Sequence, residues 1–145
     1  MIKSFSGPNR FLSNFFLAPV EFEGEVYAST EHAYQASKTL SPGLRVLIGE
    51  CPTPGEAKKL GGKVPVRSDW GAVKLKVMAT VVLCKFRWHD VLRNRLLLTG
   101  EEELVEENPA HDNFWGNCTC LDCRDITGRN WLGGILMAVR EELSP

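Results

Sequence analysis

The feature that most constrains the fold is a long helical pattern from about Ser68 to Arg87. Apolar residues recur along it so closely that they cover most of the circumference of the predicted helix. A helix that is apolar nearly all round has to be buried. With 145 residues the chain has the length of one ordinary domain. We therefore expect the other elements to pack around this helix, in a single compact domain over residues 1–145.

Shorter elements are predicted on both sides of the long helix. Capping residues, glycine stops and helical spacing predict helices from Ser29 or Thr30 to about Leu40, from Thr53 to Gly61-Gly62, over 90–98 with a stop at Gly100, and over 132–143. Apolar and acidic residues alternate from Val20 to Tyr27 around Glu23-Gly24, which predicts a hairpin. The expected fold class is mainly α with a small β portion.

Composition and hydropathy exclude several classes of protein. Apolar residues make up 43% and charged residues 24% of the chain, values typical of a globular protein. No apolar stretch approaches the ~20 residues that a membrane-spanning helix needs. Residues 1–6 lack the basic and then apolar layout of a signal peptide. We expect a cytoplasmic protein with no membrane partner.

Charge is segregated along the chain. The net charge of -1 alone argues against a general nucleic-acid binder held by phosphate contacts. Residues 58–95, however, hold ten basic and two acidic residues, a net charge of +8, and residues 96–125 hold eight acidic residues and one arginine, a net charge of -7. Two solvated faces that attract each other would explain this pattern. A divided site would explain it too, with a phosphate on the basic block and cation chemistry on the acidic one.

Five cysteines without a secretory signal are expected to be reduced. Cys118, Cys120 and Cys123 form a cluster, and His111 lies seven residues before the first of them. Three thiolates and an imidazole would complete a tetrahedral zinc site. The spacing is irregular, however, and lacks the paired C-x2-C knuckles of zinc ribbons, so ordinary loop cysteines remain the alternative. No cofactor is predicted.

One polar stripe is predicted on the helix that begins near residue 30. Glu31, Gln35 and Lys38 lie at i, i+4 and i+7, so they share one helical face. A carboxylate, an amide and an ammonium there could hold and activate a polar substrate, although the pattern alone favours a solvated stripe. His32 is expected to be a packed or surface histidine rather than a catalyst.

Residues Arg67 to Trp70 stand at the start of the long helix, where unpaired backbone N–H groups and the helix dipole favour anions. Arg67 adds a bidentate donor that suits phosphate. Trp70 could stack on a planar ring or pack in the core. The segment thus predicts an anion site next to an aromatic side chain.

A glycine-bounded loop at 111–116 combines an acid with an indole. Asp112 and Trp115 are three residues apart in it, and loops often carry function. A carboxylate beside an aromatic face could stabilise a cationic transition state, as in sugar transfer. The structural alternative is an Asx turn.

Read in order, these motifs resemble the NADAR superfamily, the group of YbiA-like N-glycosidases. The resemblance spans nearly the whole chain. It rests on FLSNF at 11–15, TEHAYQASK at 30–38, AKKLG at 57–61, RSDW at 67–70, LLLTG and ELVE within 96–106, DNFWG at 112–116 and GRNWLG at 128–133. The chain departs from many relatives at 117–125, where they carry a glycine-rich stretch instead of three cysteines.

The resemblance implies a mainly helical enzyme, a hydrolase acting on N-glycosidic bonds. It places functional positions at Glu31, Trp70, Asp112 and Trp115. Either carboxylate could stabilise the oxocarbenium ion and orient water, with the two tryptophans holding the base or ring. Our further candidates are Lys38 and Arg67 for phosphate and the 5′ side, and Asn14, Gln35 and Asn130 as hydrogen-bond partners.

The substrate implied is a ribose conjugate that carries phosphate. Branches of the superfamily act on ribosylaminopyrimidine phosphates of early riboflavin synthesis or on ADP-ribose attached to guanine, in a nucleotide or a nucleic acid. Two other function classes stay open. One is a non-catalytic module that binds ADP-ribose or NAD, and the other is a zinc-stabilised nucleic-acid module built on the cysteines and the basic block.

Overall fold

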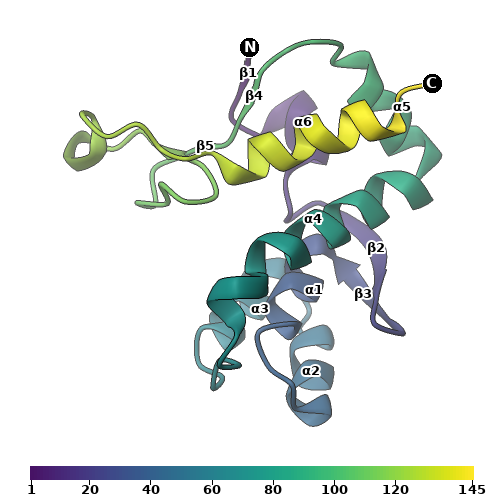
Figure 1. Ribbon diagram of the computed structural model, residues 1–145. Coiled ribbons are helices and arrows are strands. Elements are labelled where there is room, and N and C mark those ends of the chain that lie inside the picture. Colours follow the sequence, from purple (N-terminus) through teal and green to yellow (C-terminus); the bar gives the residue numbers. More distant parts are fainter. The chain divides into compact units, whose positions relative to one another are not determined.

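Helices dominate the computed structural model, which describes residues 1–145 (Figure 1). The chain forms six α-helices, two short 3-10 helices and six short strands. The strands make three separate two-stranded pairs. The predicted class, mainly α with a small β portion, is confirmed. None of the helices combines the length and the apolar character that crossing a membrane would require.

The chain divides into two compact units. The central unit is Asn14–His89, and the terminal unit combines Met1–Ser13 with Asp90–Pro145. The organisation of residues 1–145 as one domain stays a prediction.

A hairpin opens the central unit. Strands β2 (Leu17–Phe22) and β3 (Glu25–Ser29) are antiparallel, and Phe22 pairs with Glu25. The turn is therefore Glu23-Gly24, with φ angles of +49° and +85°. Two residues at positive φ suit the right-handed twist of a tight hairpin. The predicted hairpin is confirmed.

Four helices follow in the central unit: α1 (Thr30–Ala36), α2 (Pro42–Gly49), α3 (Pro54–Gly61) and α4 (Trp70–Trp88). Helices α3 and α4 lie where they were predicted, whereas the sequence patterns did not single out α2. Helix α1 ends at Ala36 and not near Leu40, because Ser37 leaves the helix and its Oγ donates to Tyr34 O at 2.6 Å.

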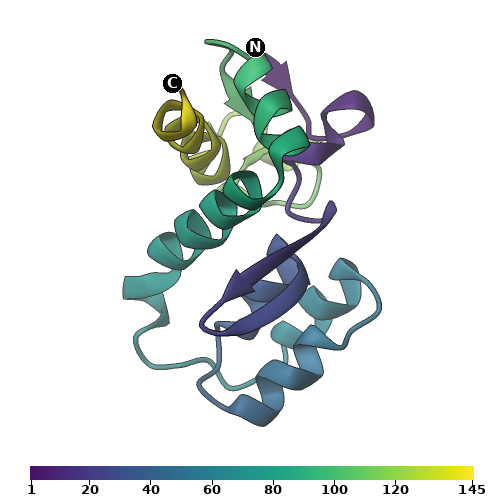
Figure 2. The same ribbon diagram turned by 90° about the vertical axis from the view of Figure 1, so that its right-hand side faces the viewer.

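The other elements of the central unit surround α1. It packs against α2, α3, α4 and both strands of the hairpin (Figure 1). Figure 2 shows the hairpin and the helices of this unit after a turn of 90° about the vertical axis. All seven residues of α1 are buried, the polar ones included. Glu31 and Gln35, two of the three residues of the predicted stripe, are therefore shielded from solvent.

The terminal unit combines two helices with two strand pairs. Strand β1 (Ile2–Lys3) pairs in parallel with β4 (Leu104–Val105), and α6 (Trp131–Leu143) packs on β4 and on α5 (Asp90–Leu98). Both helices lie where they were predicted. The remaining elements are the parallel strands β5 (Glu107–Asn108) and β6 (Asn117–Cys118) and the 3-10 helices η1 (Gly7–Leu12) and η2 (Leu121–Cys123).

Candidate active site

The carboxyl group of Glu31 lies inside the central unit, and the side chain is only 6% exposed. Glu31 is the second residue of α1, whose start is fixed in two ways. Ser29 Oγ accepts from the backbone N–H of His32 at 3.1 Å, and Asn14 O accepts from the N–H of Glu31 at 3.1 Å. The cap and the Asn14 contact together fix where this carboxyl group is held.

Gln35 holds the carboxyl group of Glu31 from one turn further along α1. Gln35 Nε2 donates to Glu31 Oε1 at 2.8 Å, and Gln35 is 3% exposed. The opposite end of the same amide, Oε1, is buried and has no hydrogen-bond partner. The expectation of a solvated stripe is wrong for these two residues, since α1 is enclosed on every side.

Burial shifts the pKa values of Glu31 and Lys38, the two ionisable residues of the predicted stripe. The pKa of Glu31 is raised, chiefly by burial, although the Gln35 hydrogen bond and the charges of Lys58 and Lys38 act in the opposite direction. The pKa of Lys38 is lowered, again chiefly by burial, while the charge of Glu31 opposes the shift. A buried carboxyl group near two ammonium groups is a typical arrangement for proton transfer.

Aromatic side chains adjoin Lys38. The Lys38 Nζ atom lies 5.7 Å from the centre of the Tyr34 ring, and the ring of Trp70 lies 5.2 Å from that of Tyr34 at an interplanar angle of 51°. Trp70 is the first residue of α4 and is partly exposed. The structure thus brings together four predicted site residues of the central unit, Glu31, Gln35, Lys38 and Trp70.

Arg67 and Asn14 belong to the central unit too. The backbone N–H of Arg67 donates to Lys38 O at 2.7 Å, and its guanidinium binds Asp69 through two bonds of 2.6 and 2.8 Å. Asn14 is buried, and its Nδ2 lies 3.4 Å from the sulfur of Met78. The substrate contacts of Arg67 and Asn14 stay predictions.

His32 is a structural residue, in agreement with the sequence. It is fully buried, with Nδ1 2.7 Å from Ser29 Oγ and Nε2 2.8 Å from Cys51 O. The carbonyl can only accept, so we assign the proton to Nε2. The ring then ties α1 to the residues just after α2.

Asp112 and Trp115 lie in the terminal unit. Asp112 Oδ1 accepts from the N–H of Phe114 at 3.0 Å and from that of Trp115 at 2.8 Å, which is the Asx turn that the sequence offered as the structural alternative. The ring of Trp115 meets that of Phe114 edge to face, with centres 4.8 Å apart. The turn holds the carboxylate of Asp112 against the backbone of Trp115, and the part of both residues in catalysis stays a prediction.

Asn130 uses its side chain to hold the backbone around β4. Its Nδ2 donates to Leu104 O at 2.8 Å and its Oδ1 accepts from the N–H of Glu106 at 3.0 Å. Its own backbone is left-handed, with φ of +50°. These bonds give Asn130 a structural role, and a contact with substrate stays a prediction.

Two lysines of the central unit were not singled out from the sequence. The charge of Lys58 acts on both Glu31 and Lys38. Lys85 is 1% exposed, and its Nζ lies 5.5 Å from the centre of the Phe16 ring. Lys85 occupies a position in the apolar row of α4, and a charge in such a row is the signal that could have identified it.

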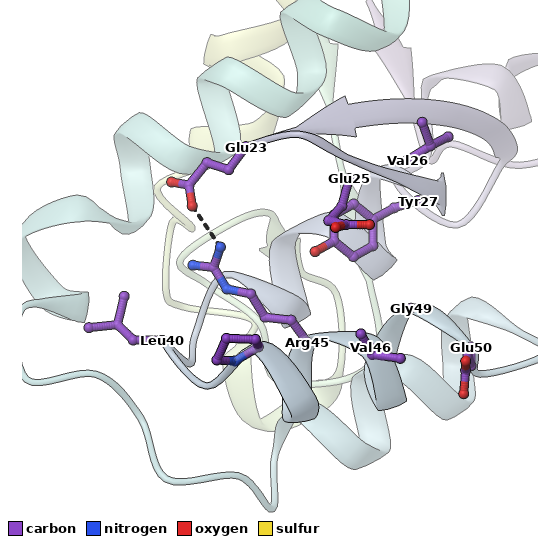
Figure 3. A pocket seen from close by; sticks show the side chains of 10 residues that line it. Glu23, Glu25, Val26, Tyr27, Leu40, Arg45, Val46, Gly49 and Glu50 are labelled. Atoms are coloured by element: carbon purple, nitrogen blue, oxygen red, sulfur yellow. Dashed lines mark hydrogen bonds and ion pairs between the residues drawn. The ribbon is translucent and has the colours of Figure 1, made fainter.

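A cavity of about 440 Å³ opens between the hairpin and α2 (Figure 3). Arg45 reaches across it to Glu23, with 2.6 Å between Nη1 and Oε2. Glu25 and Glu50 also line it, so acidic groups outnumber basic ones. Such a lining does not suit a phosphate, and none of the predicted site residues belongs to it.

Three cysteines and a histidine come together in the terminal unit. The ligand atoms of His111, Cys118, Cys120 and Cys123 all lie within 4.8 Å of one another. All five cysteines of the chain are free thiols. These four residues are the ones that could hold a metal.

Comparison with known proteins assigns the family. The model of the NADAR domain matches residues 3–144. N-glycosidase Npun_R5314 of Nostoc punctiforme is 39% identical over 141 residues, which cover 94% of this chain and 86% of that protein. N-glycosidase YbiA of Escherichia coli K12 is 35% identical over 134 residues, which cover 91% of this chain and 80% of that protein.

The fold of a relative agrees as well. The NMR structure of E. coli YbiA superposes with a TM-score of 0.83 and 34% identity, covering 98% of this chain and 83% of that one. Riboflavin biosynthesis protein VVA0006 of Vibrio vulnificus is 37% identical over 92% of this chain, which spans only 35% of that larger protein. The relatives named N-glycosidases confirm the predicted enzyme class, hydrolases of N-glycosidic bonds. The chain belongs to the NADAR family.

Proposed function

We propose that this chain hydrolyses the ribosyl C–N bond of a ribose conjugate that carries phosphate. The observation that carries the proposal is the buried carboxyl group of Glu31, held by Gln35 at 2.8 Å. A group that exchanges protons in catalysis needs a pKa near the working pH. The upward shift that burial gives Glu31 moves its pKa in that direction.

The reaction needs two proton movements. Water adds to the anomeric carbon and gives a proton to a carboxylate, while the C–N bonding electrons leave with the base nitrogen, which takes up a proton. The transition state carries positive charge on the sugar, which a second carboxylate can stabilise. We assign proton transfer to Glu31.

Cationic and aromatic side chains suit the phosphate and the base of the substrate. Lys38 is our candidate for the phosphate, next to the Tyr34 and Trp70 rings. Arg67 follows on the same side, through its backbone bond to Lys38. Trp70 would stack on the base or ring, and Asn14 and Gln35 would bond the ribose.

The substrate itself is one of two kinds. Relatives named for riboflavin biosynthesis favour ribosylaminopyrimidine phosphates. ADP-ribose on guanine, in a nucleotide or a nucleic acid, presents the same ribose and phosphate chemistry and is the second candidate. We further propose that the protein acts in the cytoplasm.

A panel assay tests the proposal. The purified chain is incubated with ribosylaminopyrimidine phosphates and with ADP-ribosylated guanosine and DNA, and the released base is measured by chromatography. Glu31→Gln should lose at least about tenfold in rate, or ~1.4 kcal/mol of transition-state stabilisation. Glu25→Gln removes an exposed carboxylate from the same unit and should keep full activity.

Calorimetry separates an enzyme from a binding module. If ADP-ribose binds and no substrate of the panel loses its base, the chain is a reader and the proposal is wrong. Full activity of Glu31→Gln on the substrate that wild type cleaves would contradict the role of Glu31 alone.

A further inference from the structure

The loop between β5 and α6 gathers four side chains with the geometry of a metal site. His111 Nδ1 lies 3.3 Å from the sulfur of Cys120 and 3.5 Å from that of Cys123. All four ligand atoms, that of Cys118 included, lie within 4.8 Å of one another. Zinc bonds of about 2.3 Å to sulfur and 2.0 Å to nitrogen place the corners of a tetrahedron roughly 3.5 to 3.8 Å apart. The cluster is close to that size.

Backbone pairing brings the four residues together. Strands β5 and β6 are parallel, and Asn108 pairs with Cys118. Asn108 Oδ1 accepts from the N–H groups of Ala110 and Asp112, which folds the chain around His111. His111 itself is left-handed, with φ of +61°. Few residues other than glycine adopt this conformation, although histidine does so more often than most.

In this loop cysteine side chains are buried and large apolar side chains are exposed, which is the opposite of an apolar core. Within residues 117–127 the buried side chains are Cys118 and Cys123, at 2% and 7% exposure. The large apolar side chains Leu121 and Ile126 are 80% and 53% exposed. The loop also lacks a disulfide. In Figure 1 it extends beyond the amino-terminal end of α6. Neither apolar packing nor a covalent bridge stabilises it.

We propose that His111, Cys118, Cys120 and Cys123 bind one Zn²⁺ ion and that the ion stabilises this loop. Three soft thiolates and an imidazole select zinc over magnesium or calcium, which prefer oxygen ligands. Four protein ligands close the coordination sphere, as in structural sites, while catalytic zinc keeps an open position.

The ion would also fix the segment that carries two predicted site residues. Asp112 follows His111 directly, and its Oδ1 holds the N–H groups of Phe114 and Trp115. Asn113 Oδ1 accepts from the N–H of Cys118 at 2.9 Å, which links this segment back to the cluster. The zinc proposal rests on the cluster alone and does not depend on the proposed glycosidase activity.

Metal analysis of the intact chain is the first test. Protein purified with a reductant and without chelator should contain one zinc per chain by mass spectrometry. Replacement by Co²⁺ should give the thiolate charge-transfer and visible bands of a tetrahedral site. Reduced protein that holds no zinc and gives no cobalt spectrum would overturn the proposal, and so would a disulfide within the cluster in freshly purified protein.

Variants then assign the ligands. Cys120 is half-buried and His111 is exposed, so Cys120→Ser and His111→Ala disturb packing least. Each should bind zinc at least about tenfold more weakly, a loss of ~1.4 kcal/mol. Cys51→Ser and Cys84→Ser change thiols of the central unit and should keep one zinc. Equal zinc loss in all four variants, or none in the first two, would contradict the assignment.

Limited proteolysis of the wild-type protein tests whether the metal stabilises the loop, and it needs no variant. Chelation should expose residues 109–127 to cleavage, and Zn²⁺ but not Mg²⁺ should restore protection, because the metal holds the loop. Cleavage that is the same with and without chelator would contradict a stabilising role.

Discussion

Gln35 donates a 2.8 Å hydrogen bond to Glu31 one turn earlier on α1, and both side chains are buried. An exposed pair of this kind on a helix contributes only a few tenths of a kcal/mol. Inside the protein, the bond holds a carboxyl group whose ionisation is opposed by burial. The pair therefore holds a buried carboxyl group in place at the expense of stability.

Glu31→Gln should make the protein more stable at neutral pH, besides reducing activity. Since the folded-state pKa of Glu31 is raised, the folded protein keeps a proton that the unfolded chain loses. Wild-type stability therefore falls as pH rises above the ordinary glutamate value and through the folded-state pKa. Urea unfolding at pH 4 and pH 7 checks this. The variant should gain relative to wild type at pH 7, and a gain that is equal at both pH values would contradict the cause.

Gly61→Ala should disturb the same pair from the neighbouring helix. A Cβ atom at Gly61 would overlap the side-chain amide of Gln35, so the amide has to move and Glu31 loses its donor. We expect overpacking to cost about 1 to 3 kcal/mol and activity to fall about tenfold. Gly62→Ala is the matched control, because its nearest new contact is an ordinary 3.5 Å. Equal behaviour of the two variants in activity and unfolding assays would refute the idea.

Lys85→Met should remove a pH dependence of stability. Burial lowers the pKa of Lys85 to about 7, whereas the unfolded chain keeps the ordinary value of 10.5. Between these values the unfolded chain binds a proton that the folded protein lacks, so wild-type stability rises with pH across this window. The cost of the buried charge is fully present below pH 7.

Urea unfolding at pH 6, 7.5 and 9 measures the effect of Lys85→Met. The variant should be more stable than wild type at pH 6, by a few kcal/mol at most, and its stability should no longer rise with pH. Lys76→Met replaces an exposed lysine of the same helix and should follow the wild-type curve. A Lys85→Met curve parallel to that of wild type would show that Lys85 does not titrate in this window.

Trp70→Ala should weaken substrate binding. Its ring lies 5.2 Å from that of Tyr34 and is partly exposed, so it can stack on a base. Stacking on an aromatic side chain is worth about 1 to 3 kcal/mol per base, so KM should rise roughly fivefold to a hundredfold. Trp88→Ala removes an indole from the other end of α4, where it is 51% exposed, and should leave KM unchanged. An unchanged KM in Trp70→Ala would exclude stacking by this residue.

Asn130→Ala should destabilise the terminal unit. The change removes the bonds to Leu104 O and to the N–H of Glu106, for a loss of about 1 to 3 kcal/mol. Chemical denaturation measures the loss, with the exposed Asn94→Ala on α5 as the control. If stability is unchanged while KM rises, Asn130 serves the substrate and not the fold.

Local sequence signals were sufficient to predict most of the helices and the hairpin. Thr53 Oγ1 accepts from the N–H of Glu56 at 3.2 Å, as the capping pattern predicts, and Glu23-Gly24 forms the predicted turn. Such signals act between residues that are neighbours in sequence, so they can be read without the fold. Helix α2 was missed although Ser41 caps it and Pro42 begins it, because a short helix gives little periodicity.

For the candidate site, the sequence could predict only which types of residue take part and which of them share a helical face. Spacing showed that Glu31, Gln35 and Lys38 share one side of α1, and the family motifs selected Glu31 and Trp70. Spacing could not show that the other helices and the hairpin enclose that side. The influence of Lys58 was hidden as well, because it acts from a different helix.

The sequence by itself determined where helices and turns begin, which side chains share a helical face and which residues could bind a metal. Only the tertiary structure decided that the polar face of α1 is buried and that His111 meets Cys120 and Cys123. Both depend on contacts between segments far apart in sequence. Burial, pKa shifts and metal geometry follow from such contacts, because they depend on which atoms exclude water from a group and not on its neighbours along the chain.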